Sequence, residues 1–130
     1  MLKSVEKKAM ALAESYLKNR GWCVEDVSRK RRHKGYDFLA RKGRKKVKIE
    51  VKGCSHPWGD PRPHSTEFDE QKRLVADYLY VVYFIENERP KLVVIPRDAI
   101  KREYLTTKFS YCISSRFKKE SVLRPYLKRI

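Results

Sequence analysis

The sequence is short of acidic residues, of cysteine and of long apolar runs. Its 16 Asp and Glu residues are outnumbered by 32 Lys and Arg residues over 130 positions, which leaves a formal net charge of +16 at pH 7. An excess of this size attracts polyanions, and nucleic acid is the commonest of them. Anionic membrane surfaces and ribosome association are the alternatives that the charge alone allows.

Membrane and secretory segments are missing as well. No apolar stretch approaches the roughly 18 to 20 residues that a membrane span requires. The first ten residues, MLKSVEKKAM, lack the apolar core of a secretory signal. We therefore expect a cytoplasmic protein that has no membrane partner. Three cysteines, an odd number spread far apart, favour reduced thiols over a disulfide framework.

Several common site motifs are absent. The sequence has no Walker loop, no dinucleotide fingerprint, no Ser-His-Asp order and no CxxC pair. Cys54, His56 and His64 share one segment, but a zinc site would need a fourth ligand, so we expect none there. Cys23 and Cys112 are expected to be small buried hydrophobes.

Apolar spacing predicts an α/β fold with a central mixed sheet flanked by helices. A helix is expected over residues 3–20, with Gly21 placed to end it. Strands are expected over residues 22–28, 36–42, 45–52, 78–86 and 91–96. A second helix is expected from about Thr66, after a long loop over residues 53–65.

Small elements are expected beyond residue 96: a short helix over 97–104, an edge strand over 109–114 and a helix over 118–127. The predicted order is α-β-β-β-α-β-β plus these small C-terminal elements. The length fits one domain that spans residues 1–130.

Charged residues lie on two of the expected strands, which a tight turn at Gly43 joins. Side chains alternate between the two faces of a strand, so Glu50 and Lys52 share one face with Lys46 and Lys48. Asp37 lies on the neighbouring expected strand. If the register permits, Asp37 and Glu50 are neighbours on that face.

Two neighbouring carboxylates repel each other unless a cation lies between them. Oxygen ligands suit Mg²⁺ or Mn²⁺, and such an ion could polarise a phosphodiester and lower the pKa of a bound water. Lys52 could orient or deprotonate that water, or neutralise the charge that develops on the phosphorus group. The alternative interpretation is a cross-strand salt bridge on an exposed hairpin face.

An N-terminal helix followed by GWCVEDVS, GYD, IEVKG, a loop, a helix and YLYVVYF resembles the PD-(D/E)XK nuclease superfamily, which has the restriction-endonuclease-like fold. Over residues 1 to about 96 the order is similar to Mrr-like endonucleases and archaeal Holliday-junction resolvases. The motif's first acid, second acid and lysine match Asp37, Glu50 and Lys52, while Tyr36 replaces the proline. The resemblance implies a metal-dependent nuclease, with the backbone carbonyl of Val51 as a further metal ligand.

Some members of the superfamily have a further acid on the first helix. At 100° per residue Glu6 falls within the apolar arc of this helix and Glu14 falls on the solvent side, so Glu6 is the preferred candidate. The alternative is a surface glutamate. Gln71 is a weaker catalytic candidate, because related nucleases often have a polar residue on the second helix. The favoured interpretation of Gln71 is a structural hydrogen bond.

Basic residues cluster between Arg29 and Lys48, where eleven Lys or Arg residues accompany a single acid. Residues 29–34, RKRRHK, are interpreted as a phosphate clamp, with a nuclear-localisation-like run and a solvated loop as alternatives. The loop over residues 53–65 is interpreted as a flap on the substrate. Ser28 is included because resolvases use a serine in a nearby loop. The residues expected to contact nucleic acid are Ser28, Arg29, Lys30, Arg31, Arg32, Lys34, Trp58, Arg62, Arg116 and Lys118.

Together these features predict a Mg²⁺- or Mn²⁺-dependent endonuclease that acts on duplex or branched DNA. The chain has little room for a separate recognition domain, so structure-specific or partner-directed cutting is expected. A homodimer is expected by analogy alone. RNA remains a possible substrate, because no residue reads the sugar. The alternative function is a basic nucleic-acid-binding module, for DNA or RNA, that has no catalysis.

Overall fold

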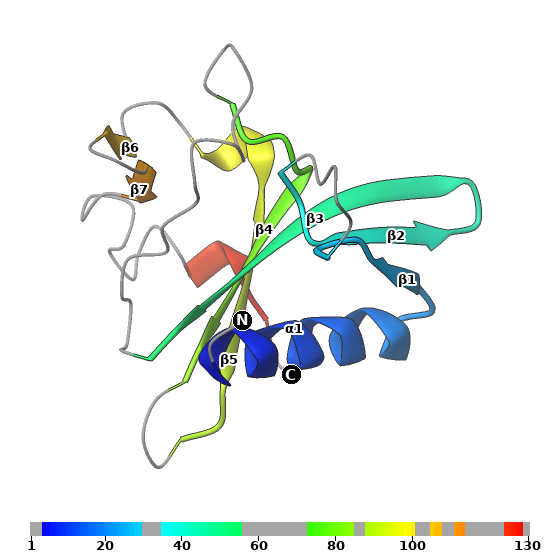
Figure 1. The fold of residues 1–130 in the computed structure, drawn as a ribbon, viewed down its shortest axis with the longest axis horizontal. Coiled ribbons are helices and arrows are strands. Elements are labelled where there is room, and N and C mark those ends of the chain that lie inside the picture. Colours follow the sequence, from blue (N-terminus) through cyan, green and yellow to red (C-terminus); the bar gives the residue numbers. More distant parts are fainter. Residues whose placement is uncertain are drawn as a thin grey trace.

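The structure is a computed structural model that describes residues 4–29, 35–55, 73–84, 88–100, 105–107, 111–113 and 124–128. Figure 1 shows a long helix packed against a sheet. The helix is α1 (Ser4–Asn19), and η2 (Arg97–Ala99) and η4 (Arg124–Tyr126) are 3₁₀ turns. The strands are β1 (Cys23–Asp26), β2 (Phe38–Lys42), β3 (Lys45–Cys54), β4 (Tyr78–Tyr83), β5 (Lys91–Pro96), β6 (Leu105–Thr107), β7 (Tyr111–Ile113) and β8 (Leu127–Lys128).

The main sheet has six strands in the order β1-β2-β3-β4-β5-β8. β3 is antiparallel to β2 and parallel to β4, and the other pairs in this sheet are antiparallel. The predicted mixed sheet is therefore confirmed. A parallel neighbour needs a long crossover connection, and here it falls between β3 and β4. The helix predicted from about Thr66 belongs to this connection and lies outside the described residues.

One face of the sheet is covered by α1. Ala9, Ala13 and Leu17 recur at intervals of four residues, and each is at most 1% exposed. This spacing places them along one line of the helix, and the two alanines let its backbone approach the sheet closely. Beneath them lie the buried residues Phe38, Ala40, Ile49, Val51, Tyr80, Val82 and Leu92.

The helix ends where the sequence predicts. Gly21 has φ +85°, a left-handed conformation that glycine adopts at low cost. The amides of Gly21 and Trp22 donate to the carbonyls of Lys18 and Leu17, so the last turn keeps its acceptors occupied.

The opposite face of the sheet has its own apolar cluster. β4 contributes residues to both faces, which explains why its sequence is almost continuously apolar. Burial raises the pKa of the Tyr80 phenol on the α1 face, so that ring stays neutral beside Tyr16. The buried members of the opposite cluster are Cys54, Leu74, Ala76, Leu79, Val81, Tyr83, Val93 and Ile95.

α1 and β3 approach each other closely at Gly53. A Cβ atom at this position would lie 2.8 Å from Val5 Cγ1, 3.0 Å from the Val5 carbonyl oxygen and 3.1 Å from Ala9 Cβ. The first two distances involve a short branched side chain and a backbone atom, neither of which can move aside without shifting the helix. The packing of α1 therefore requires glycine here.

We expect Gly53→Ala to lower the free energy of unfolding by about 1–3 kcal/mol, because overpacking displaces α1 from the sheet. Urea unfolding followed by circular dichroism measures this cost. In a Val5→Ala background the same substitution should cost less, since the nearest contact atom is gone. An equal cost in both backgrounds would show that contact with the helix is not what requires glycine.

Several predicted element boundaries are wrong. β1 ends at Asp26 rather than residue 28, because the Asp26 carboxylate accepts a hydrogen bond from the Ser28 amide at 2.9 Å and turns the chain. β2 starts at Phe38, so Asp37 precedes the strand. β3 continues to Cys54, and β4 ends at Tyr83.

The C-terminal elements also differ from the prediction. β7 pairs with β6 in a separate two-stranded sheet instead of extending the main one. Within the predicted helix over 118–127, residues 124–126 form η4 and Leu127 begins β8, which pairs with β5. Pro125 explains this, since proline cannot continue a helix interior. The predicted helix over 97–104 is represented by η2 alone in the part that the structure describes.

Two further findings concern exposure and membranes. Cys23 is exposed on the edge strand β1 instead of buried as predicted, whereas Cys54 is buried. In the described part of the chain, no helix has the length and apolar character needed to cross a membrane.

Candidate active site

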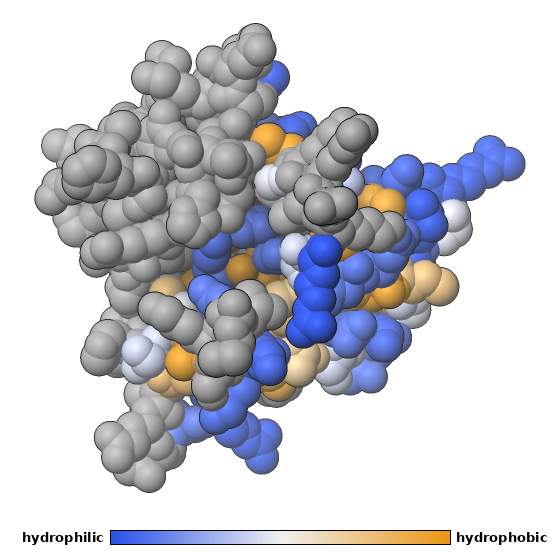
Figure 2. All heavy atoms as spheres, viewed as in Figure 1, coloured by the Kyte–Doolittle hydropathy of each residue, from blue (hydrophilic) through white to orange (hydrophobic). Residues whose placement is uncertain are grey.

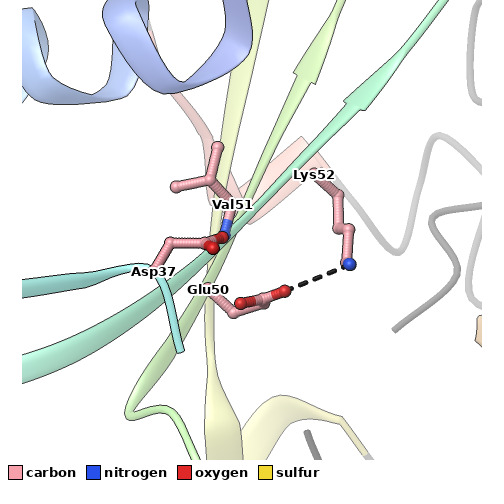
Figure 3. A network of polar contacts seen from close by, with 4 residues as sticks. All are labelled: Asp37, Glu50, Val51 and Lys52. Carbon is pink, nitrogen blue, oxygen red and sulfur yellow. Dashed lines mark hydrogen bonds and ion pairs between the residues drawn. The ribbon is translucent and has the colours of Figure 1, made fainter. Parts of the chain in front are cut away.

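Asp37, Glu50 and Lys52 converge on the sheet face that lies opposite α1. Ile49 and Val51 belong to the cluster beneath α1, so the alternation along β3 directs Glu50 and Lys52 to the other side. There they lie beside Leu79 and Val81, their register partners on β4. Figure 3 shows Val51 directed toward α1, Glu50 and Lys52 directed away from it, and the Asp37 carboxylate beside the Val51 amide.

The Asp37 carboxylate is fixed by the backbone of β3. Pairing between β2 and β3 starts at Phe38 and Ile49, and just before it the Asp37 amide donates to the Ile49 carbonyl at 2.9 Å. The Val51 amide donates to Asp37 Oδ2 at 2.9 Å. A side chain thus replaces the missing strand partner of Val51, and this holds the carboxylate at the edge of β3.

Glu50 is a buried charge. Its exposed fraction is 2%, and Lys52 Nζ lies 3.1 Å from its Oε2 atom (Figure 3). Burying a carboxylate is costly unless it is paired, so this ion pair offsets part of the cost. Glu50 and Lys52 both belong to β3, and both side chains are largely buried. The predicted alternative of a cross-strand salt bridge on an exposed hairpin face is therefore wrong for Glu50.

Comparison with known proteins identifies the family. Residues 5–95, more than half of the chain, match the family model described as Protein NO VEIN, C-terminal. The chain belongs to the NO VEIN C-terminal family. This family is a PD-(D/E)XK-like domain, so the predicted relationship is confirmed. No curated protein matches the chain.

A solved structure supports the fold of this NO VEIN C-terminal domain. The 1.6 Å structure of Archaeoglobus fulgidus Hjc, a Holliday junction resolvase from an archaeal hyperthermophile, is similar to it with a TM-score of 0.58 and 17% sequence identity. The match covers 98% of this chain and 93% of that one. The restriction-endonuclease-like fold predicted from the sequence is thereby confirmed.

The donor atoms in this NO VEIN C-terminal domain suit a hard divalent cation. Asp37 and Glu50 supply carboxylate oxygens. In a strand, the N–H and C=O of one residue point to the same neighbour, so the Val51 carbonyl faces the side where its amide meets Asp37. Oxygen donors of this kind fit Mg²⁺ or Mn²⁺ better than zinc.

The protein supplies few such donors. Within the described ranges, no group of three or more His, Cys, Asp or Glu side chains is placed to hold a metal ion. Mg²⁺ commonly binds through one or two carboxylates and keeps several waters or substrate oxygens. Two carboxylates and one carbonyl therefore fit a site that substrate and water would complete.

Glu6, the predicted further acid, lies in the first turn of α1. The helical angle places it in the apolar arc, but in the structure it is exposed while Glu14 is half-buried. The helical angle of a residue does not say which part of the helix contacts the sheet. At the start of α1 it is Val5 and Ala9 that lie against Gly53. The catalytic role of Glu6 stays a prediction.

Two of the predicted nucleic-acid contacts lie within the described part of the chain. The Ser28 hydroxyl donates to Asp26 Oδ1, so it takes part in the turn after β1. Arg29 is exposed beside a hollow of about 350 Å³ that Asp26 and Glu14 also line. The remaining predicted residues lie outside the described part: Lys30, Arg31, Arg32, Lys34, Trp58, Arg62, Gln71, Arg116 and Lys118.

Tyr36 and Lys48 were not predicted to be site residues. Lys48 Nζ lies 5.5 Å from the centre of the Tyr36 ring, a distance at which a cation and an aromatic face attract each other. Tyr36 packs against the cluster on the site face and immediately precedes Asp37. The alternation of β3 placed Lys48 on this face, but a stacking partner before the adjacent strand leaves no signal in the sequence.

Proposed function

We propose that this chain is a metal-dependent endonuclease that hydrolyses phosphodiester bonds in DNA. The observation that carries the proposal is the buried carboxylate of Glu50, which lies 3.1 Å from Lys52 Nζ. The Asp37 carboxylate is held at the same strand, β3, by the hydrogen bond that it accepts from the Val51 amide. An acid and a base placed together under cover, at the cost of desolvation, are typical of a functional site.

In this proposal Asp37, Glu50 and the Val51 carbonyl would hold Mg²⁺ or Mn²⁺. The bound ion would polarise the phosphodiester and lower the pKa of a water molecule. Lys52 donates hydrogen bonds to the attacking water or to a phosphate oxygen and offsets the negative charge that develops there. The water oxygen bonds to phosphorus and loses a proton to solvent, while the bond from phosphorus to the sugar oxygen breaks and that oxygen leaves as a hydroxyl after taking up a proton from solvent.

Branched DNA is the proposed substrate class. The similar solved structure is that of a Holliday junction resolvase, and the net charge of +16 suits a polyanion. Either the shape of the junction or a partner protein would direct the cut. Asp37, Glu50 and Lys52 would then act on the phosphodiester group alone and would not select the substrate.

Cleavage of supercoiled plasmid and of synthetic four-way junctions tests the proposal. We expect nicking in Mg²⁺ or Mn²⁺ and none in EDTA. A four-way junction made of RNA, run alongside, separates the two nucleic acids. Tight binding of these substrates with no cutting under either metal would overturn the nuclease and favour a binding module.

A further inference from the structure

The hairpin formed by β2 and β3 carries a dense positive charge that the proposed site does not use. Between Phe38 and Ile49 there is no acidic residue, and six cations occur there, all of them exposed: Arg41, Lys42, Arg44, Lys45, Lys46 and Lys48. Figure 1 shows this hairpin extending past the end of α1. Figure 2 shows hydrophilic residues at that end of the molecule.

The register of the hairpin places like charges directly opposite each other. Arg41 pairs with Lys46, and Lys42 pairs with Lys45. Like charges at such positions destabilise a hairpin. A hydrogen bond from Lys42 Nζ to the Arg20 carbonyl, at 2.7 Å, offsets part of this repulsion at Lys42. For Arg41, Lys45 and Lys46, the described residues provide no ion pair, so the fold leaves this repulsion in place.

Cations project from both faces of the hairpin. Lys46 lies on the face of Glu50 and Lys52, together with its partner Arg41, whereas Lys45 lies on the α1 face. A flat anionic surface such as a membrane would meet cations on one face alone. Two cationic faces match a groove with phosphates along both walls, and a two-stranded ribbon fits the major groove of B-DNA.

We infer that the β2–β3 hairpin is a duplex-binding arm that enters the major groove of DNA on one side of the cleavage site. The part of this inference that places the arm beside a cleavage site rests on the proposed function. The contact between the hairpin and DNA does not depend on cleavage. From Glu50 to the turn at Gly43, β3 rises about 3.3 Å per residue, or about 23 Å in all. At 3.4 Å per base pair the arm reaches about seven base pairs from the cut.

A charge-neutralised variant tests the arm. Arg41→Gln, Lys45→Gln and Lys46→Gln are combined, because these residues cover both faces and their side chains make no hydrogen bond in the described structure. A matched control removes three exposed cations from α1 by Lys7→Gln, Lys8→Gln and Lys18→Gln. Binding to a DNA duplex is measured by fluorescence anisotropy in EDTA, over a range of salt concentrations.

We expect the hairpin variant to bind at least tenfold more weakly at about 0.1 M salt. Each lost phosphate contact should make the slope of log affinity against log salt shallower by about 0.9, hence by about 2.7 for three. The α1 control should keep the slope of the natural chain to within about 1. Equal slopes for the natural chain and the hairpin variant, or equal losses in the two variants, would overturn the arm.

The length of the arm gives a second test, in which the duplex is shortened on either side of the cut and the cleavage rates are compared. Duplexes shortened on one side of the cut should be cleaved more slowly once that side falls below about seven base pairs, while shortening the other side should matter less. The hairpin variant should lose this asymmetry. A natural chain that cleaves both series alike would overturn the arm and leave the nuclease intact.

Fold stability and the type of nucleic acid serve as further controls. Because like charges are removed, the hairpin variant should unfold at a temperature at least as high as the natural chain, which excludes misfolding as the cause of weaker binding. Double-stranded RNA has a deep, narrow major groove that side chains cannot read, so equally tight, hairpin-dependent binding to it would overturn groove entry. If the natural chain binds no DNA, the DNA substrate of the proposed function fails as well.

Discussion

Replacing Glu50 with glutamine, or Asp37 with asparagine, is expected to abolish metal-dependent cleavage while DNA stays bound. Each change keeps the shape of the side chain, and asparagine can still accept the Val51 amide, so the fold should survive. A bound metal ion contributes several kcal/mol to such a reaction, and we therefore expect the rate to fall by at least about 10³-fold. Initial nicking rates and anisotropy in EDTA measure the two effects.

Asp77→Asn is the matched control for this pair of variants. Asp77 Oδ2 accepts the Lys48 amide at 2.8 Å, as Asp37 accepts that of Val51, so both acids bind the backbone of β3. Asp77 contributes no atom to the proposed metal site, and its variant should cleave within about twofold of the natural rate. Cleavage by Glu50→Gln at the natural rate would contradict the assigned roles, as would equal losses in all three variants.

The second large effect is expected at Lys52. Lys52→Met should lower the cleavage rate by about 10²- to 10³-fold, the range for loss of one positioned hydrogen-bond donor at a developing negative charge. It should also lower the free energy of unfolding by about 2 kcal/mol, because the 2%-exposed Glu50 carboxylate loses its cation. Cleavage assays and urea unfolding report the two losses separately.

Combining Lys52→Met with Glu50→Gln distinguishes stability from catalysis. Glutamine carries no charge, so the double variant should regain most of the lost stability and none of the lost activity. This is a double-mutant cycle on a single contact. If stability falls additively in the double variant, the ion pair is not what offsets the burial of Glu50.

Local patterns in the sequence were enough to predict much of the fold and the core of the site. Alternation along KKVKIEVK placed Glu50 and Lys52 on one face, because the period of a strand is two residues. The apolar run of β4 indicated a central strand. The position of Asp37 beside this face depended on the register, which the structure supplies through Phe38 and Ile49.

The burial of Glu50 could not be predicted from its neighbours in the sequence. The strand around it is rich in lysine and is typical of an exposed hairpin face. The apolar cluster on that face comes from distant positions such as Leu74, Val93 and Ile95, with Tyr126 packed against it. Burial here is a property of the assembled fold, and the same holds for β8, whose strand partner lies far back in the chain.

The ten-residue strand β3 joins three regions without a break. One end forms the cationic hairpin, the middle carries Glu50 and Lys52, and Gly53 near the other end lies against α1. A continuous strand of this kind acts as a ruler, because its length sets the spacing between the hairpin turn and the carboxylate. Such a ruler lengthens only in steps of two residues per strand, about 6.6 Å, because a single added residue would turn every side chain beyond it to the opposite face.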